Sequence, residues 1–132
     1  MEAVSLEVAE QEVQAWIEKC RFRKRKVESN KEYVDQLVEG VIHGDLSIDE
    51  ETHDIEMELI RPVGDVRKLV FKTELKVKEI RHKLKSGNVS AGDSDGRILA
   101  YISALTNQPF SVINDLNTED QSLASSIAIF FF

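Results

Sequence analysis

The first third of the chain carries the apolar spacing of a helix. From residue 6 to residue 41, apolar or small side chains recur at steps of three and four, which holds them on one face. They are Leu6, Ala9, Val13, Trp16, Cys20, Val27, Val34, Leu37 and Val41. The pattern predicts one helix over about residues 3–26 and a second over about 30–43, with one continuous helix as the alternative.

Local signals mark the expected ends of these helices. Ser29 and Glu32 have the spacing of a capping box, in which the two side chains satisfy free amides at a helix start. Gly40 and Gly44 follow near the end of the apolar stripe. Because glycine favours helix ends, we expect these two residues to close the helical region.

The middle of the chain changes to a period of two. Between Asp45 and Lys72, apolar residues alternate with charged or polar ones, and Pro62–Asp65 has the composition of a turn. The alternating apolar residues are Leu46, Ile48, Ile55, Met57, Leu59, Leu69 and Phe71. This predicts a small antiparallel meander with one solvated face, whose apolar face helices must cover because three short strands are not stable alone.

The last third returns to helical spacing. Val77, Ile80 and Leu84 predict a short helix that stops at Ser86–Asn88, and a polar linker follows it. A second helix is expected to start near Ser94, to turn Ile98, Tyr101, Ile102 and Leu105 inward, and to end at Asn107 and Pro109. A helical turn around Phe110–Leu116 precedes a final helix, for which Thr118 and Gln121 have the spacing of a cap.

Together these patterns predict an α+β fold that is mostly helical. We expect N-terminal helices, a small three-stranded antiparallel meander and then a C-terminal cluster of three to four helices. Residues 1–43 form the helical segment and residues 44–132 the α+β domain, expected together as one compact unit. A chain of 132 residues is long enough to bury such a core without disulfides.

Composition points to a soluble protein of a reducing compartment. The chain has 24 acidic and 17 basic residues and one cysteine, Cys20, which cannot pair within the chain. The first residues lack the basic and apolar regions of a signal peptide, and the longest apolar run, residues 123–132, is too short to span a bilayer. The net charge of −7 argues against a surface that binds nucleic acid over the whole molecule.

One basic block interrupts this acidic chain. Five cations lie within six residues, around Phe22: Arg21, Arg23, Lys24, Arg25 and Lys26. Clustered cations can neutralise phosphates, and an aromatic ring can stack on a base. The alternative is a solvated end of the first helix, where cations favour the helix dipole.

No group of residues indicates catalysis or a bound cofactor. His43 with Asp45, and Glu51 with His53 and Asp54, offer metal-ligand types, but their spacing matches no defined site. Gly92–Gly96 is expected to be a polar loop with a helix cap, because it lacks the remaining residues of a calcium loop or a serine nucleophile. Isolated Cys20, on the apolar stripe, is expected to be a small core residue. We therefore expect a protein without enzyme activity, metal or cofactor.

The second part of the chain resembles the tail assembly chaperones of long-tailed bacteriophages and prophages. The resemblance covers about residues 44–132 and rests on apolar patterns. After the three strands come a helix that reads R-x-L-A-Y-I-x-A-L-T from Arg97, a turn at Pro109, a D-x-x-x-L helix from Asp120 and the terminal Phe130–Phe132. The segment before Gly44 matches no part of the family pattern.

The resemblance implies a binding protein in the cytoplasm of the bacterial host. Such chaperones coat the tape measure protein, a long helical polypeptide, and keep it soluble until tail tube subunits assemble around it. They are generally absent from the finished particle, and many also exist in a longer, frameshifted form. The tape measure protein, and with it the tail tube protein, are therefore the partners that the resemblance implies, without a cofactor and without a membrane.

We expect the partner surface to be an apolar helix face. Three aromatic rings at a chain end must dock or meet a partner. The expected apolar contacts are Leu6, Val13, Trp16, Phe130, Phe131 and Phe132, and the expected charged contacts are Arg21, Arg23, Lys24, Arg25 and Lys26. The alternative is that the stripe packs on the rest of its own domain. A homo-oligomer would multiply weak contacts along a long client.

Two other functions stay open at this point. One is a structural subunit retained in a phage tail or a contractile injection particle. The other is a small regulator that binds nucleic acid through residues 21–26, which the acidic balance of the chain disfavours.

Overall fold

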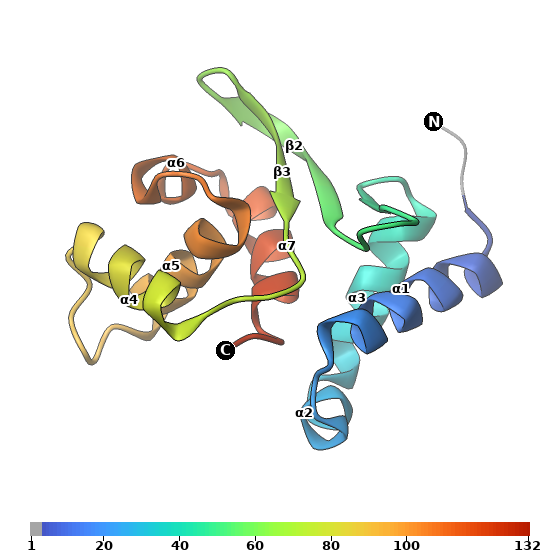
Figure 1. Cartoon of the computed structure of the whole chain (residues 1–132). Helices are drawn as coiled ribbons and strands as arrows, with labels where there is room; N and C mark the ends of the chain where they lie inside the picture. The colour runs from blue at the N-terminus through green and yellow to red at the C-terminus, as the bar shows by residue number, and fades with distance from the viewer. Residues whose placement is uncertain (1–3) are drawn as a thin grey trace.

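The chain folds into helices on both sides of a small antiparallel sheet (Figure 1). The structure is a computed structural model, and it describes residues 4–132. The elements are α1 (Leu6–Cys20), α2 (Lys24–Ser29), α3 (Lys31–Ile42), β1 (Leu46–Ile48), β2 (Ile55–Val63), β3 (Val66–Phe71), α4 (Val77–Ser86), α5 (Ser94–Thr106), α6 (Phe110–Asn114) and α7 (Thr118–Ala128). The predicted α+β class, with N-terminal helices, a meander and C-terminal helices, is confirmed.

The first helix is shorter than its sequence pattern predicts. It starts at Ser5, whose side chain accepts a hydrogen bond from the Val8 amide at 3.3 Å, and it ends at Arg21 in the left-handed conformation, φ 60°. The prediction of a helix through residue 26 is therefore wrong, and so is the continuous alternative. Phe22 turns back against Trp16, with ring centroids 5.3 Å apart, which a straight helix would not allow.

Two of the predicted helix signals act differently in the structure. Ser29 is the last residue of α2, and Asn30 precedes α3 without a side-chain cap, so the capping box is wrong. Gly40 lies inside α3, where an added Cβ would lie 2.8 Å from Leu46 Cδ1. Its role is therefore to let β1 approach the helix, whereas Gly44, with φ 81°, makes the turn that follows.

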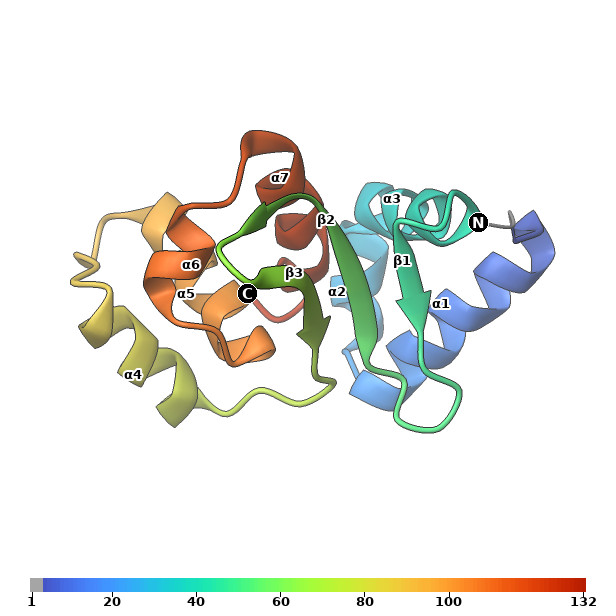
Figure 2. The ribbon, with the colours of Figure 1, turned by 90° about the horizontal axis from the view of Figure 1, so that it is seen from above.

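The sheet has the predicted order and faces. β2 is central and pairs antiparallel with β1 and β3. Met57 lies opposite Leu46 on one side and Leu69 on the other, and all three are buried. On the other face, Lys68 lies 3.0 Å from exposed Glu56. α7 contacts both β2 and α3, and Figure 2 shows it beside β2. The helices thus cover the apolar face, as the alternation predicted.

The outer part of the β2–β3 hairpin is irregular. The predicted turn at Pro62–Asp65 is shorter in the structure, because Pro62 and Val63 belong to β2 and only Gly64 and Asp65 connect the strands. Gly64 has φ 57°, a conformation that side chains disfavour. The pairing register shifts between Glu58 and Val63, so this part of β2 has amides without a regular strand partner.

Asp120 of α7 satisfies two of these amides. Its carboxylate accepts hydrogen bonds from the backbone N–H groups of Ile60 at 3.0 Å and Arg61 at 3.1 Å, and the side chain is almost completely buried. The α7 N-cap is Asn117, whose side chain accepts from the Asp120 amide at 2.9 Å. The predicted cap at Thr118 is therefore wrong by one residue. With Asn117 as the cap, Asp120 lies in the first turn of α7 and its carboxylate contacts β2.

The two ends of the described chain meet in an aromatic cluster, which we define as Trp16, Phe22, Phe130 and Phe131. The Trp16 ring packs edge-on against Phe130 at 5.6 Å and Phe131 at 6.3 Å, and Phe22 stacks on Phe130 at 5.7 Å. Trp16 and Phe130 have no exposed surface. The cluster therefore fixes the N-terminal helices to the C-terminal helical part.

We expect the Phe130→Ala substitution to destabilise the whole fold. Removing a fully buried aromatic side chain leaves a cavity and typically costs about 3–5 kcal/mol. The matched control is Phe132→Ala, because Phe132 is 42% exposed and contacts only the surface of the same region. Its loss should cost about 1 kcal/mol. Chemical denaturation measures both, and equal losses would contradict the cluster's role.

We expect Asp120→Ala to loosen the hairpin locally. The amides of Ile60 and Arg61 lose a charged acceptor that is buried on α7, at a cost of about 1–3 kcal/mol. Hydrogen exchange should speed up at these two amides more than at the paired amides of β3. Glu119→Ala, one residue earlier and exposed, is the control and should leave the exchange unchanged.

Candidate functional site

Three of the predicted partner residues lie in the core. Val13 is 1% exposed, and Trp16 and Phe130 are fully buried. Phe131 is half-buried within the aromatic cluster. In this fold these side chains stabilise the chain itself, so we correct the expectation that Val13, Trp16 and Phe130 offer a surface to a partner. Their helical stripe packs on the rest of the same chain.

Exposed apolar surface remains at the start of α1. Leu6 is 59% exposed and Val8 43% exposed. Phe132, at 42%, is covered in part, because its ring lies 5.0 Å from the Tyr101 ring and 5.1 Å from the Arg97 guanidinium. Of the predicted apolar contacts, Leu6 is therefore the one that faces solvent most openly.

Leu6 borders a hollow between α1 and α3, which we call the α1–α3 hollow. It has a volume of about 400 Å³. Its apolar lining consists of Leu6, Val13, Val34 and Val38, and its polar lining of Glu10, Gln14, Asp35 and Glu39. An apolar floor with a polar rim between two helices is the arrangement that takes up the apolar side of an amphipathic segment.

The basic block is exposed, but it does not close a single long helix. Arg21 is the C-cap of α1, whereas Lys24 and Arg25 start α2, where the helix dipole disfavours cations, and Lys26 lies in the last turn of that six-residue helix. The explanation by the end of the first helix therefore holds for Arg21 alone. Burial lowers the pKa of Lys26 from its usual value. Phe22 packs on the aromatic cluster and is not free to stack on a base.

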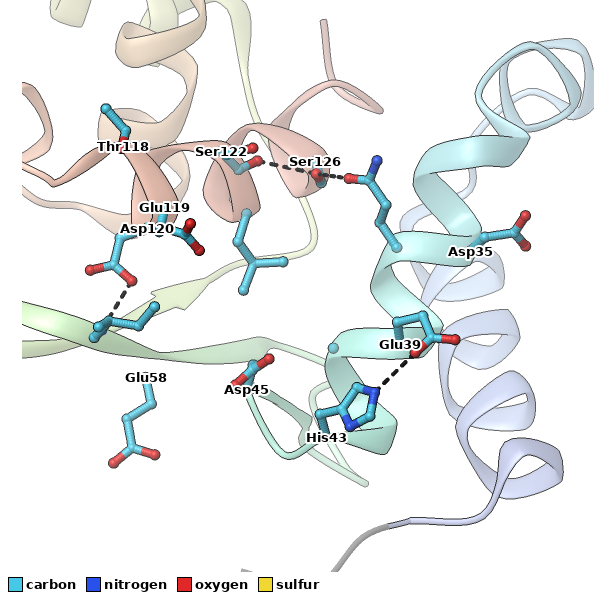
Figure 3. A pocket seen from close by; sticks show the side chains of 14 residues that line it. Asp35, Glu39, His43, Asp45, Glu58, Thr118, Glu119, Asp120, Ser122 and Ser126 are labelled. Carbon is cyan, nitrogen blue, oxygen red and sulfur yellow. Dashed lines mark hydrogen bonds and ion pairs between the residues drawn. The ribbon is translucent and has the colours of Figure 1, made fainter.

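The largest hollow of the described region is an acidic groove between α3, β2 and α7 (Figure 3). Its volume is about 650 Å³. Six carboxylate residues line it, together with one histidine: Asp35, Glu39, Asp45, Glu58, Glu119, Asp120 and His43. Its apolar lining includes Ile60, which is 67% exposed, and Leu123. The groove therefore combines a negative charge with a substantial apolar surface.

Most of these carboxylates are free to meet a cation. Asp120 uses both oxygens on the hairpin, and Glu39 lies 3.0 Å from His43 Nε2. The other four, Asp35, Asp45, Glu58 and Glu119, form no ion pair with any residue that the structure describes. At the back of the groove, the Ser126 hydroxyl donates to Gln36 Oε1 at 2.6 Å and so ties α7 to α3.

The remaining ionisable groups do not assemble a catalytic or metal centre. Within residues 4–132, no group of three or more histidine, cysteine or acidic side chains has the geometry to hold a metal ion. Glu51, His53 and Asp54 belong to the β1–β2 loop, in which Asp49 accepts hydrogen bonds from the Thr52 and Glu51 amides. These two bonds lower the pKa of Asp49, so its carboxylate stays ionised as a loop cap.

Cys20 has the chemistry of a core thiol. Burial, with a smaller contribution from the Asp54 charge, raises its pKa from 9.0 to about 12. The thiol therefore stays protonated at neutral pH and is a poor nucleophile. As for the membrane, none of the helices in the described part of the chain has the length and apolar character to span one.

We expect Cys20 to resist alkylation in the folded protein. A rise of three pKa units reduces the thiolate fraction at pH 8 by about 1,000-fold. Iodoacetamide labelling followed by mass spectrometry should therefore be slow in buffer and fast in denaturant. Rapid labelling of the native protein would contradict the buried, protonated state.

The arrangement supports binding to another molecule through the α1–α3 hollow, the basic block and the acidic groove. Sequence reasoning found the basic block and one edge of the hollow but missed the groove, whose lining comes from three distant segments. Comparison of the chain with protein-family models gave no match, and comparisons with curated proteins and with solved structures gave none either.

Proposed function

We propose that the chain is a tail assembly chaperone that binds and solubilises the tape measure protein in the cytoplasm of a bacterial host. The resemblance of residues 44–132 to that family motivates the proposal. The observation that carries it is the α1–α3 hollow, whose lining is half apolar and half polar, with Leu6 59% exposed at its edge. A tape measure protein is a long helix-rich polypeptide, and an amphipathic helix fits such a surface.

The mechanism is helix-in-groove recognition. An apolar side chain of the client enters between α1 and α3 and contacts Leu6, Val34 and Val38. Glu10 and Gln14 on the rim favour a client helix with polar or basic flanks. Burial of one exposed leucine contributes about 1.5–3 kcal/mol, which gives only a weak single contact. Repetition along a long client supplies the affinity.

Binding of this kind keeps the client soluble by covering its apolar face. The chaperone leaves when tail tube subunits replace it, and a weak, repeated contact allows that replacement without a chemical step. This role uses none of the aromatic cluster, because those rings are already packed within the chain.

We expect Leu6→Asp to abolish client solubilisation without unfolding the chain. Leu6 is the first residue of α1, where an acidic side chain favours the helix dipole. The control is Val77→Asp, because Val77 is the first residue of α4 and is 71% exposed. The measurement is the soluble fraction of a phage tape measure protein that is co-expressed with each variant.

The outcomes of this experiment test the proposed function and the proposed binding site independently. No rise in client solubility with the unaltered chain would refute the proposed function. A rise that Leu6→Asp and Val77→Asp leave equally intact would refute the α1–α3 hollow as the client site. Circular dichroism of both variants checks that each chain is folded.

A further inference from the structure

The chain carries two strongly charged surfaces of opposite sign that do not pair with each other. The basic block presents Arg21, Arg23, Lys24 and Arg25 to solvent, and these side chains make no ion pair with any described residue. The acidic groove holds four carboxylates that are likewise free of ion pairs. Residues 4–132 form three ion pairs. Glu39 pairs with His43 inside the groove, and the other two pairs, Lys68–Glu56 and Lys72–Glu79, lie outside both surfaces.

We propose that the basic block of one copy of this chain docks into the acidic groove of a second copy. The contact joins four exposed cations to a groove with four carboxylates that are free of ion pairs, so each surface supplies what the other lacks. This inference rests on the two surfaces alone and does not depend on the identity of a client.

The shapes of the two surfaces suit such a contact. The block continues into α2, a six-residue helix without a buried side chain, at the outer end of the N-terminal helices (Figure 1). A short element of this kind is able to enter a groove of about 650 Å³. Ile60 and Leu123 in the groove offer apolar contact to the aliphatic stems of arginine and lysine.

The groove is built well enough to keep its shape when a cation enters. The Ser126–Gln36 hydrogen bond joins α7 to α3, and the Asp120 carboxylate joins α7 to β2. All three walls are therefore connected by polar contacts.

Docking of this type makes an open-ended assembly. The block and the groove are different surfaces, so each copy uses its block on one neighbour and its groove on another. Head-to-tail repetition produces a chain of copies or a closed ring. Exposed ion pairs are individually weak and screened by salt, so the assembly should depend on concentration and dissolve at high ionic strength.

Charge reversal tests the contact. One variant carries Lys24→Glu and Arg25→Glu in the block, and the other carries Glu39→Lys and Glu119→Lys in the groove. All four side chains are exposed. Sedimentation velocity over a range of concentrations, at about 0.02 M and about 1 M salt, measures the assembly. We expect the unaltered chain to assemble at low salt only, and each variant alone to be monomeric.

Mixing the two variants gives the decisive result. The two introduced glutamates in the block of one variant then face the two introduced lysines in the groove of the other, and the two unaltered surfaces face each other as well. We expect a one-to-one mixture to assemble, and a chain with all four substitutions to assemble alone. Restoration of this kind excludes unfolding as the cause of the monomeric state.

Matched controls change the net charge by the same amount elsewhere. Lys78→Glu with Arg81→Glu on α4 matches the block variant, and Glu7→Lys with Asp65→Lys matches the groove variant. Both controls should assemble like the unaltered chain. Glu7 lies in the first turn of α1, as Glu119 lies in the first turn of α7, so the helix-dipole effects are comparable.

Three results would overturn the proposal. The first is an unaltered chain that stays monomeric at low salt and high concentration. The second is assembly that survives either reversal, or that the mixture fails to restore. The third is a block that binds duplex DNA in a salt-sensitive manner while the chain shows no self-association, which would assign the cations to nucleic acid.

Discussion

The aromatic cluster is the contact on which the arrangement of the chain depends. Trp16 and Phe22 come from the first helical region and Phe130 and Phe131 from the last residues, so the cluster closes the chain on itself. Separately, α7 contacts α3 directly, and the Ser126–Gln36 hydrogen bond joins them, so these two walls of the acidic groove lie side by side. The aromatic cluster explains why α1 stops at Arg21: the backbone must turn there for Phe22 to reach the Trp16 ring.

Local periodicity was sufficient for the fold class but not for every helix end. The alternation of Ile55, Met57 and Leu59 with polar residues predicts a strand with one buried face. In the structure these three side chains are buried on the same face of β2. The end of α1 could not be predicted in this way, because arginine and lysine are good helix formers and the break depends on a contact distant in sequence. The shifted caps at Asn30 and Asn117 have a similar cause, since neighbouring polar residues compete for the same amides.

The site was harder to predict than the fold. A helical stripe identifies which residues are apolar but not whether they pack within the chain or on a partner, and here Trp16 is buried whereas Leu6 is exposed on the same stripe. The acidic groove draws its lining from α3, the β1–β2 region and α7. The acidic character of the middle segment was visible in the sequence, but the contribution of Glu119 became apparent only once α7 was placed against α3. A sequence shows which residues are charged but not which of them lie close together in the folded chain. A site assembled from distant segments is therefore not visible in it.

The division between an apolar interior and a charged exterior limits how this molecule can recognise others. Four of its aromatic side chains close the chain on itself, and the large apolar side chains that stay exposed, such as Leu6, Ile60 and Val77, are scattered over different elements. A tight interface normally needs buried aromatic anchors, and a molecule without them relies on repetition and on electrostatic attraction. The basic block leads into α2, whereas the acidic groove lies between α3, β2 and α7, so the two surfaces of opposite charge occupy different parts of the chain. The proposed role on a long, repetitive polypeptide requires this kind of recognition, because many weak contacts can form along the client and each can be released separately.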